Sequence, residues 1–175
     1  MADWQRILRE HGRTVWQVAW RLLGDRSDAE ECFQETFLSA YEVSCREEVR
    51  DWPALLKTLA TRRALDLLRA KIRREDGLDR STDCGRIPGE APQPHQQARR
   101  NELADRLRRA MTALSPRQAE VFSLRFVEGM RYEEIGRALD LTTNAVGVLL
   151  HEARERLRER LGEGNENARR TTGTR

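Results

Sequence analysis

Residues 132–157, YEEIGRALDLTTNAVGVLLHEARERL, have the spacing of two helices joined by a sharp turn. Gly136 is small at the point where a crossing helix must come close, Asp140 falls at the turn, and Leu141 is the apolar plug. Thr142 is placed to cap the second helix. The apolar stripe expected on that helix contains Val146, Leu149 or Leu150, Ala153, Leu157 and Leu161. This pattern predicts a helix-turn-helix.

The motif predicts DNA binding, because its second helix enters the major groove and contacts base edges with its N-terminal side chains. Those side chains are here Thr143, Asn144, Gly147, Val148 and His151. The alternative is a plain helical hairpin with an exposed polar face. We favour DNA binding because a capped helix, opened by Ser115, Pro116 and Gln118, precedes the motif.

The predicted DNA-contacting helix has no positive charge in its first two turns, where Gly147, Val148 and Leu149 stand. Asp140 also occupies a turn position at which glycine is preferred, at a cost of about 1 kcal/mol. Phosphate contacts are left to Arg125, Arg131, Arg137, Arg154, Arg156 and Arg158. We expect this module to bind DNA weakly alone and to need a second contact or a partner.

The rest of the chain also has the composition of helices. Leucine occurs 21 times and alanine 18 times, isoleucine only four times, and no stretch alternates apolar and polar residues over the length of a strand. Gly24 ends a first predicted helix, and a capping box of Ser27 and Glu30 opens a second. Asp51 caps a third, which runs to about Arg74. The expected fold class is all-α.

Composition divides the chain into two small helical domains. Residues 1–75 hold the three helices just described, and residues 76–100 are a linker rich in glycine, proline and polar residues. The second domain covers residues 101–162 and contains the helix-turn-helix. Residues 163–175 have no large apolar side chain, which predicts a disordered tail.

Several classes of protein are excluded by composition. No apolar run approaches the roughly 18 to 20 residues needed to cross a bilayer, and residues 1–20 do not resemble a secretory signal. We therefore expect a cytoplasmic protein without membrane insertion. Cys32, Cys45 and Cys84 have the spacing of neither a disulfide framework nor a zinc site, so no metal is expected.

Nothing in the sequence suggests catalysis. His11, His95 and His151 are scattered, no Ser/His/Asp or Cys/His group is suggested, and no glycine-rich loop is present that would hold a phosphate. We expect no enzymatic activity, no catalytic residues and no cofactor.

Charge is distributed unevenly over the first domain. Residues 25–51 contain nine acidic and three basic residues, whereas residues 57–74 contain seven basic residues and one acidic residue. Arg62, Arg69 and Arg73 fall on one face of the third predicted helix, which suits a nucleic-acid backbone. A solvated helix face is an equally good interpretation. The acidic second helix could likewise face a basic protein surface or water.

Four stretches of the sequence together resemble one protein family. Residues 28–37, DAEECFQETF, look like the region-2 signature of bacterial RNA polymerase sigma factors, and residues 52–74 are similar to the promoter-reading helix that follows it. Residues 114–122, LSPRQAEVF, and residues 132–136, YEEIG, resemble region 4. The order of these stretches and the short length of the chain make it similar to an extracytoplasmic-function (ECF) sigma factor. That family acts as a dissociable RNA polymerase subunit that directs promoter recognition and transcription initiation.

The resemblance implies protein partners. Glu31, Gln34 and Glu35 match positions that family members use to bind the clamp helices of the polymerase β′ subunit. Core RNA polymerase, through these helices and the β flap, is therefore an expected partner. An anti-sigma factor is a candidate partner, because family members are commonly held inactive by one that covers the polymerase-facing surface.

The resemblance also implies contacts to double-stranded promoter DNA. The third helix and the loop at 43–50 match elements that melt the minus-10 element and capture an extruded base. The expected minus-10 contacts are Arg62, Arg69 and Arg73. Many members carry Asn at the position of Arg62, so their minus-10 preference does not transfer. Tyr41 and Trp52 could stack on a base, but their apolar helical positions favour the core.

Residues 143–152 match the minus-35 reading helix of the family. The expected minus-35 contacts are Thr143, Asn144, Gly147, Val148, His151 and Arg154. Gly147, Val148 and Leu149 depart from the Lys, Ser and Arg that are frequent there, so the minus-35 sequence does not transfer either. The alternative function is a stand-alone helix-turn-helix regulator of the response-regulator type, but residues 1–75 lack the strands of a receiver domain.

Overall fold

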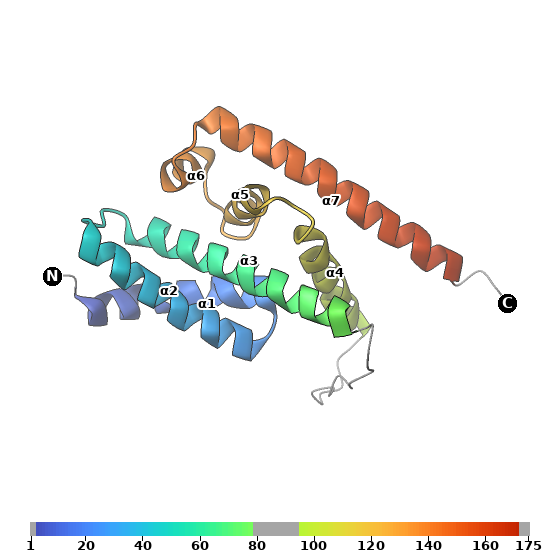
Figure 1. The fold of residues 1–175 in the computed structure, drawn as a ribbon, viewed down its shortest axis with the longest axis horizontal. Helices are drawn as coiled ribbons and strands as arrows, with labels where there is room; N and C mark the ends of the chain where they lie inside the picture. Colours follow the sequence, from blue (N-terminus) through green and yellow to red (C-terminus); the bar gives the residue numbers. More distant parts are fainter. Residues whose placement is uncertain (1–2, 79–94, 172–175) are drawn as a thin grey trace.

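The computed structural model describes residues 3–78 and 95–171 (Figure 1). Within these two ranges the chain forms seven helices and no strand, which confirms the all-α prediction. The helices are α1 (Trp4–Leu23), α2 (Arg26–Arg46), α3 (Trp52–Leu78), α4 (His95–Met111), α5 (Pro116–Phe126), α6 (Tyr132–Leu139) and α7 (Thr143–Thr171). Each helix in the described ranges is too short or too polar to cross a lipid bilayer.

Short polar side chains set the starts of the first three helices. Asp3 caps α1 by accepting a hydrogen bond from the Arg6 amide at 3.0 Å, and Asp51 caps α3 by accepting from the Ala54 amide at 3.0 Å. The predicted capping box of Ser27 and Glu30 is wrong. Asp25 caps α2 instead, accepting from the Asp28 amide at 3.0 Å, because the left-handed turn at Gly24 lets the new helix start two residues earlier.

Helices α1, α2 and α3 pack into a first unit around a core of small and medium apolar side chains. The most deeply buried members are Val15, Val18, Ala19, Ala29, Cys32, Ala40, Leu56, Ala60 and Ala64. Burial of this stripe stabilises the unit at about 25 cal/mol per Å² of apolar surface removed from water. The many alanines let the three helices approach closely, so one compact bundle forms without large side chains at its centre.

Helices α5, α6 and α7 form the helix-turn-helix unit. The predicted capping box opens α5: Ser115 accepts from the Gln118 amide at 3.3 Å, and Gln118 accepts from the Ser115 amide at 3.1 Å. Asp140 adopts the left-handed conformation at φ 55°, and the Leu141 amide donates to the Gly136 carbonyl at 2.8 Å. A side chain at 136 would place its Cβ 2.6 Å from the Leu141 carbonyl oxygen, so glycine is required there.

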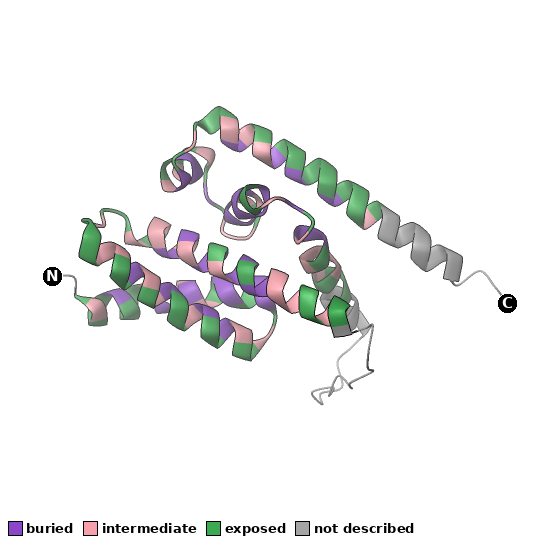
Figure 2. Ribbon diagram, in the orientation of Figure 1, coloured by how far each residue is buried: buried purple, intermediate pink, exposed green. Residues whose placement is uncertain are grey.

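The two units pack against each other, and α3 lies between them. Figure 1 shows α5 and α6 on the side of α3 that faces away from α1 and α2. One buried cluster extends from the first unit into the second, where it includes Met111, Leu114, Ala119 and Leu157. Figure 2 shows the matching pattern, with buried residues on α5 and on the inner face of α7.

The helix bounds differ from the expected domain bounds at three places. Helix α3 continues to Leu78 and α4 begins at His95, so both extend into the expected linker at 76–100. Helix α7 continues to Thr171, which covers most of the tail expected at 163–175. For α3 and α7 the sequence has no proline at the point where the helix was expected to stop, and an existing helix propagates at little cost. Residues 79–94 and 172–175 lie outside the described residues.

Candidate nucleic-acid interface

The residues expected to bind the polymerase share the outer face of α2. Glu31, Gln34 and Glu35 are all exposed, opposite the side that buries Ala29, Cys32, Thr36 and Ala40. Glu31 accepts a hydrogen bond from Arg63 of α3 at 2.8 Å, which holds its carboxylate at the edge of the bundle. The arrangement presents a negative surface on a rigid helix, pointing away from the second unit.

Exposed apolar side chains accompany this acidic face. Leu38 is 59% exposed and Tyr41 is 53% exposed, one and two turns after Gln34 on the same side of α2. The core position favoured for Tyr41 is therefore wrong: its ring packs on Trp4 at 5.5 Å, at the surface. Trp52 is half-buried against the other side of Trp4, at 5.3 Å. Helical spacing from Gln34 is the signal that would have found Leu38.

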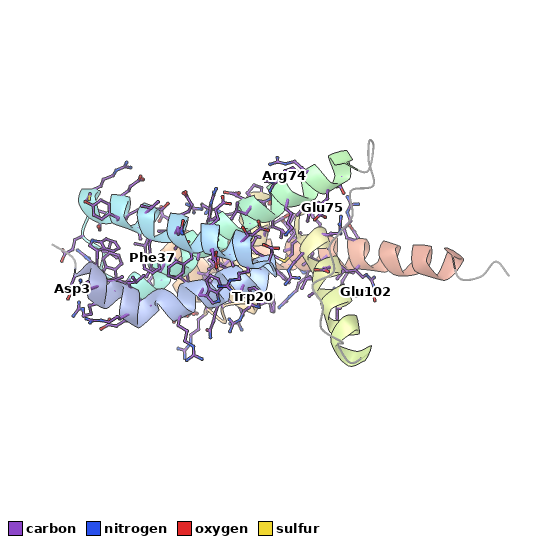
Figure 3. All side chains as sticks on the ribbon, turned by 90° about the horizontal axis from the view of Figure 1, so that it is seen from below. Asp3, Trp20, Phe37, Arg74, Glu75 and Glu102 are labelled. Carbon is purple, nitrogen blue, oxygen red and sulfur yellow. The ribbon has the colours of Figure 1, made fainter. Side chains whose placement is uncertain are left out.

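A second aromatic patch lies on α1. The rings of Trp16 and Trp20 stack with centroids 6.5 Å apart, and Trp20 is exposed. Figure 3 looks onto the face formed by α1 and α2, where Trp20 and Phe37 are labelled. This patch also contains Arg21 and Arg26, and exposed aromatic residues together with arginine are typical of protein-binding surfaces.

The expected minus-10 arginines of α3 have different surroundings. Arg62 donates from Nε and Nη2 to Oε1 of Glu120 in α5, at 3.1 and 2.8 Å. Arg69 is only 19% exposed in its side chain and lies 3.4 Å from Asp66 of its own helix. Arg73 is exposed near the end of α3. The structure therefore does not present the three as one open basic face.

Other basic residues of α3 hold the first unit together. Lys71 contacts Asp28 at 2.7 Å and Asp25 at 3.7 Å, which ties the end of α3 to the start of α2. The hydrogen bond from the Asp28 amide stabilises the ionised carboxylate of Asp25 and lowers its pKa, and the positive charge of Lys71 adds a smaller effect in the same direction. Arg63 of α3 and Glu31 of α2 form a further ion pair. Some of the basic residues of α3 and acidic residues of α2 noted in the sequence therefore pair with each other and help to pack the two helices together.

The start of α7 exposes most of the expected minus-35 residues. Thr143, Asn144, Val148 and His151 are exposed, and Asn144, Val148 and His151 follow helical spacing along one face. Gly147 is partly buried and faces the ring of Tyr132 of α6. The helix is capped as predicted, with Thr142 Oγ1 accepting from the Ala145 amide at 3.1 Å.

The arginines around this helix are engaged to different degrees. Arg154 lies over the ring of Phe126 at 4.9 Å, and Arg125 lies over the ring of Tyr132 at 5.4 Å. Arg125 also donates to the Met130 carbonyl at 2.9 Å, which closes the turn between α5 and α6. Arg125 therefore stabilises the fold through contacts within the unit. The exposed arginines are Arg131, Arg137, Arg154, Arg156 and Arg158.

A groove of about 690 Å³ separates the loop before α3 from α6. Its lining includes Val49, Arg50 and Lys57 from the first unit and Glu134 and Arg137 from the second. The loop expected at 43–50 is shorter than predicted, because residues 43–46 form the last turn of α2 and only the residues between 46 and 52 are loop. The segment 43–50, which the resemblance assigns to the minus-10 element, thus faces the helix-turn-helix unit. Within the part of the chain that the structure describes, no group of three His, Cys, Asp or Glu side chains is arranged to hold a metal ion.

Comparison with known proteins identifies both units. Residues 7–74 match the family Sigma-70 region 2, and residues 104–157 match the family Sigma-70, region 4. The first match covers most of α1, all of α2 and most of α3, and the second covers the C-terminal half of α4, all of α5 and α6 and the first half of α7. The order of the two matches is the order that the sequence motifs predicted.

Similar proteins carry the same two regions. The chain is 32% identical to the ECF RNA polymerase sigma factor SigE of Mycolicibacterium smegmatis, over 92% of this chain and 62% of SigE. It thus spans less than two thirds of that relative. It is 31% identical to the RNA polymerase sigma factor CarQ of Myxococcus xanthus, over 90% of this chain and 88% of CarQ. It is 25% identical to the ECF RNA polymerase sigma factor SigW of Bacillus subtilis, over 84% of this chain and 82% of SigW.

A solved structure shares the fold. The sigma factor RpoE of Bartonella quintana, solved in complex with the anti-sigma factor NepR, aligns with a TM-score of 0.53 at 20% identity. The alignment covers 93% of this chain and 98% of RpoE. Two region matches in order and relatives along most of the chain agree with the resemblance seen in the sequence. The chain belongs to the extracytoplasmic-function sigma factors of the sigma-70 family.

Proposed function

We propose that this chain is a dissociable subunit of RNA polymerase that directs promoter recognition and transcription initiation. The observation that carries the proposal is the presence of both Sigma-70 regions on one chain, each folded as a helical unit with its candidate contact face exposed in whole or in part. The proposal gives the chain no catalytic role, because RNA synthesis is the work of the polymerase. It also places the protein in the cytoplasm, with its polymerase.

The outer face of α2 is the proposed docking surface for core polymerase. Glu31, Gln34 and Glu35 supply carboxylates and an amide on a rigid helix, and Leu38 and Tyr41 supply apolar area next to them. Apolar contacts of this kind provide most of the affinity at a protein interface, whereas the charges select a basic partner and speed association. The β′ clamp helices and the β flap are the proposed partner elements.

Promoter DNA is the proposed partner of α3 and α7. Arg62, Arg69 and Arg73, with the segment 43–50, would contact the minus-10 element, where extruding a base costs a few kcal/mol. On α7, the Asn144 amide has the donor and acceptor that match adenine, and the exposed Val148 can contact a thymine methyl group. Tethering both units to one enzyme raises their effective concentration at the two elements, so each DNA contact can be weak alone.

An anti-sigma factor is a further proposed partner. The similar sigma factor RpoE was solved in complex with the anti-sigma factor NepR, and the exposed apolar and acidic face of α2 would suit a protein that competes with the polymerase. A stand-alone regulator of the response-regulator type is not favoured, since residues 7–74 match Sigma-70 region 2.

Co-purification with core polymerase tests the docking surface. The wild-type chain should elute with core polymerase in a stoichiometric complex, and the double variant Gln34→Ala with Glu35→Lys should elute separately. Glu159→Lys is the matched control: it makes the same charge change at an exposed position of α7, and it should bind like the wild type. Equal binding by the double variant and the control would assign the acidic face to solvent.

A further inference from the structure

A row of arginine and tryptophan side chains runs along the outer side of α1. Arg6, Arg9, Arg13, Trp16 and Trp20 follow one another at alternating steps of three and four residues, so they share one face of the helix. The three arginines and Trp20 are exposed, and Trp16 is half-buried. We call this row the α1 ridge, and it extends over about 21 Å at 1.5 Å per residue.

The arginines of the α1 ridge have no acidic partner in the described part of the chain. None of the three forms an ion pair within residues 3–78 and 95–171, whereas Arg21 and Arg26, beside the end of the ridge, each pair with a glutamate. Glu10 is the one acidic residue of α1, and it lies 3.9 Å from His11. The ridge therefore carries positive charge that the protein itself does not neutralise.

The two tryptophans of the ridge differ in their contacts. Trp16 packs on the core of the first unit and meets the ring of Phe33 edge-on at 6.3 Å. Trp20 packs on Trp16, with ring planes inclined by only 17° and centroids 6.5 Å apart, and it remains 47% exposed. A large ring that is held on another ring and is open to solvent is a platform on which a planar group can stack.

An open cleft adjoins this platform. Its volume is about 510 Å³, and it is lined by Trp16, Gln17, Trp20, Arg21 and Arg26. The lining combines aromatic rings, an amide with both a donor and an acceptor, and guanidinium groups. These groups match the three parts of a nucleotide, because rings stack on a base, an amide pairs with a base edge and a guanidinium binds a phosphate.

The order of these groups fits a single strand of nucleic acid better than a duplex or a protein surface. A strand repeats one phosphate and one base per nucleotide, so it can place phosphates on the arginines while a base stacks on Trp20. In a duplex the faces of each base are covered by its neighbours, so Trp20 would have no base on which to stack. An acidic protein surface supplies carboxylates without a repeated planar group beside them.

We propose that the α1 ridge binds single-stranded nucleic acid, with phosphates on Arg6, Arg9 and Arg13 and a base stacked on Trp20. This surface is additional to the faces of α3 and α7 proposed for promoter DNA. Helix α1 packs against α3 through its buried side, and the ridge lies on the opposite side of the helix. Figure 3 looks onto α1 and α2 and labels Trp20 near the end of α1.

Variants of Trp20 test the stacking contact in the free, full-length chain. Trp20→Leu keeps an apolar side chain but removes the ring, and Trp20→Phe keeps a ring. In fluorescence anisotropy, we expect Trp20→Leu to bind a 12-nucleotide oligothymidylate at least about fivefold more weakly than the wild type. Trp20→Phe should recover most of this loss, and both variants should bind a duplex like the wild type. Oligouridylate of the same length separates RNA from DNA as the source of the strand.

Charge variants test the phosphate contacts. Glu10→Gln removes the carboxylate next to Arg6 and Arg13 and should tighten binding of the strand, whereas Glu159→Gln makes the same charge change at an exposed position of α7 and should not. Together, Arg9→Gln and Arg13→Gln should reduce the slope of log affinity against log salt by about 1.4, because each phosphate contact on a single strand contributes about 0.7.

Cross-linking locates the strand on the chain. A strand that carries 5-iodouracil cross-links to aromatic side chains under ultraviolet light, and it should label the tryptic peptide of residues 14–21, which contains both tryptophans of the ridge. Labelling confined to other peptides would place the strand elsewhere and contradict the proposal.

The proposal is also overturned if the folded ridge variants bind the strand like the wild type. Loss of core polymerase binding by Trp20→Leu, with strand binding unchanged, would assign the ridge to a protein partner instead. The strand measurements need no polymerase. If the wild-type chain fails to bind core polymerase while the ridge variants lose the strand, the proposed function is wrong and the ridge site stands.

Discussion

Buried carboxylates lie at the boundary between the two units, and Glu128 shows that burying such a charge destabilises the fold. Its carboxylate is almost fully covered, and burial raises its pKa above the ordinary value for glutamate, although Arg21 and Lys57 act in the opposite direction. A raised pKa in the folded chain means that the folded state holds a proton that the unfolded state has already released. The ionised form therefore destabilises the fold at neutral pH, and lowering the pH relieves the penalty.

Glu128→Gln should consequently melt at a higher temperature than the wild type at pH 7.5. The difference should shrink as the pH falls from neutral toward 4.5, because the wild type becomes protonated over that window and the variant does not. Thermal unfolding followed by circular dichroism at several pH values measures this. A lower melting temperature for the variant at pH 7.5 would show that attraction to Arg21 and Lys57 outweighs desolvation.

Sequence reasoning placed many individual residues correctly and failed on pairs distant in the chain. Cap residues such as Asp51 and Ser115 accept from the amide three positions ahead, so local spacing predicted them. The pair of Arg62 and Glu120 joins residues 58 positions apart, and neither position has a local signal for it. Tyr41 was misplaced because its apolar character favours the core, whereas its position on α2 faces solvent.

Among the elements, the turn from α6 to α7 depends most strictly on one side chain. A Cβ at Gly136 would meet the Leu141 carbonyl oxygen at 2.6 Å, and this atom belongs to a backbone that Asp140 already holds in the left-handed conformation. The two helices can cross at this point only because the side chain is absent. The sequence motif predicted this requirement from spacing alone.

Gly136→Ala should lower the free energy of unfolding by about 1 to 3 kcal/mol, the usual cost of overpacking. Gly77→Ala is the control, because nothing lies within 4 Å of its Cβ position, and alanine in a helix is favoured over glycine by up to about 1 kcal/mol. Urea unfolding of both variants measures the two changes. If Gly136→Ala is as stable as Gly77→Ala, the close crossing described for α6 is incorrect.

The elements also show where sequence patterns lose precision. The starts of α3 and α5 were predicted because Asp51 and Ser115 are strong cap residues. The ends of α3 and α7 were placed too early, since the composition changes near residues 74 and 162 contain no proline that would stop a helix. Composition indicates where a core ends, and a helix can extend beyond its core.

In the whole molecule, the two units predicted from composition are present but are packed together. The boundary between them buries Ala119 in the same cluster as the alanines of α3 and pairs carboxylates of the second unit with arginines of the first. No sequence pattern predicted this packing, because it depends on matching surfaces rather than on periodicity. The acidic face of α2 remains outside this contact and is accessible while the two units are packed together.

Run-off transcription on genomic fragments tests the central claim most directly. Core polymerase supplemented with this chain should give discrete transcripts that neither component gives alone, and the Gln34→Ala, Glu35→Lys variant should abolish them. The account is contradicted if the mixture gives no transcript beyond that of core polymerase while the chain by itself binds a DNA site tightly.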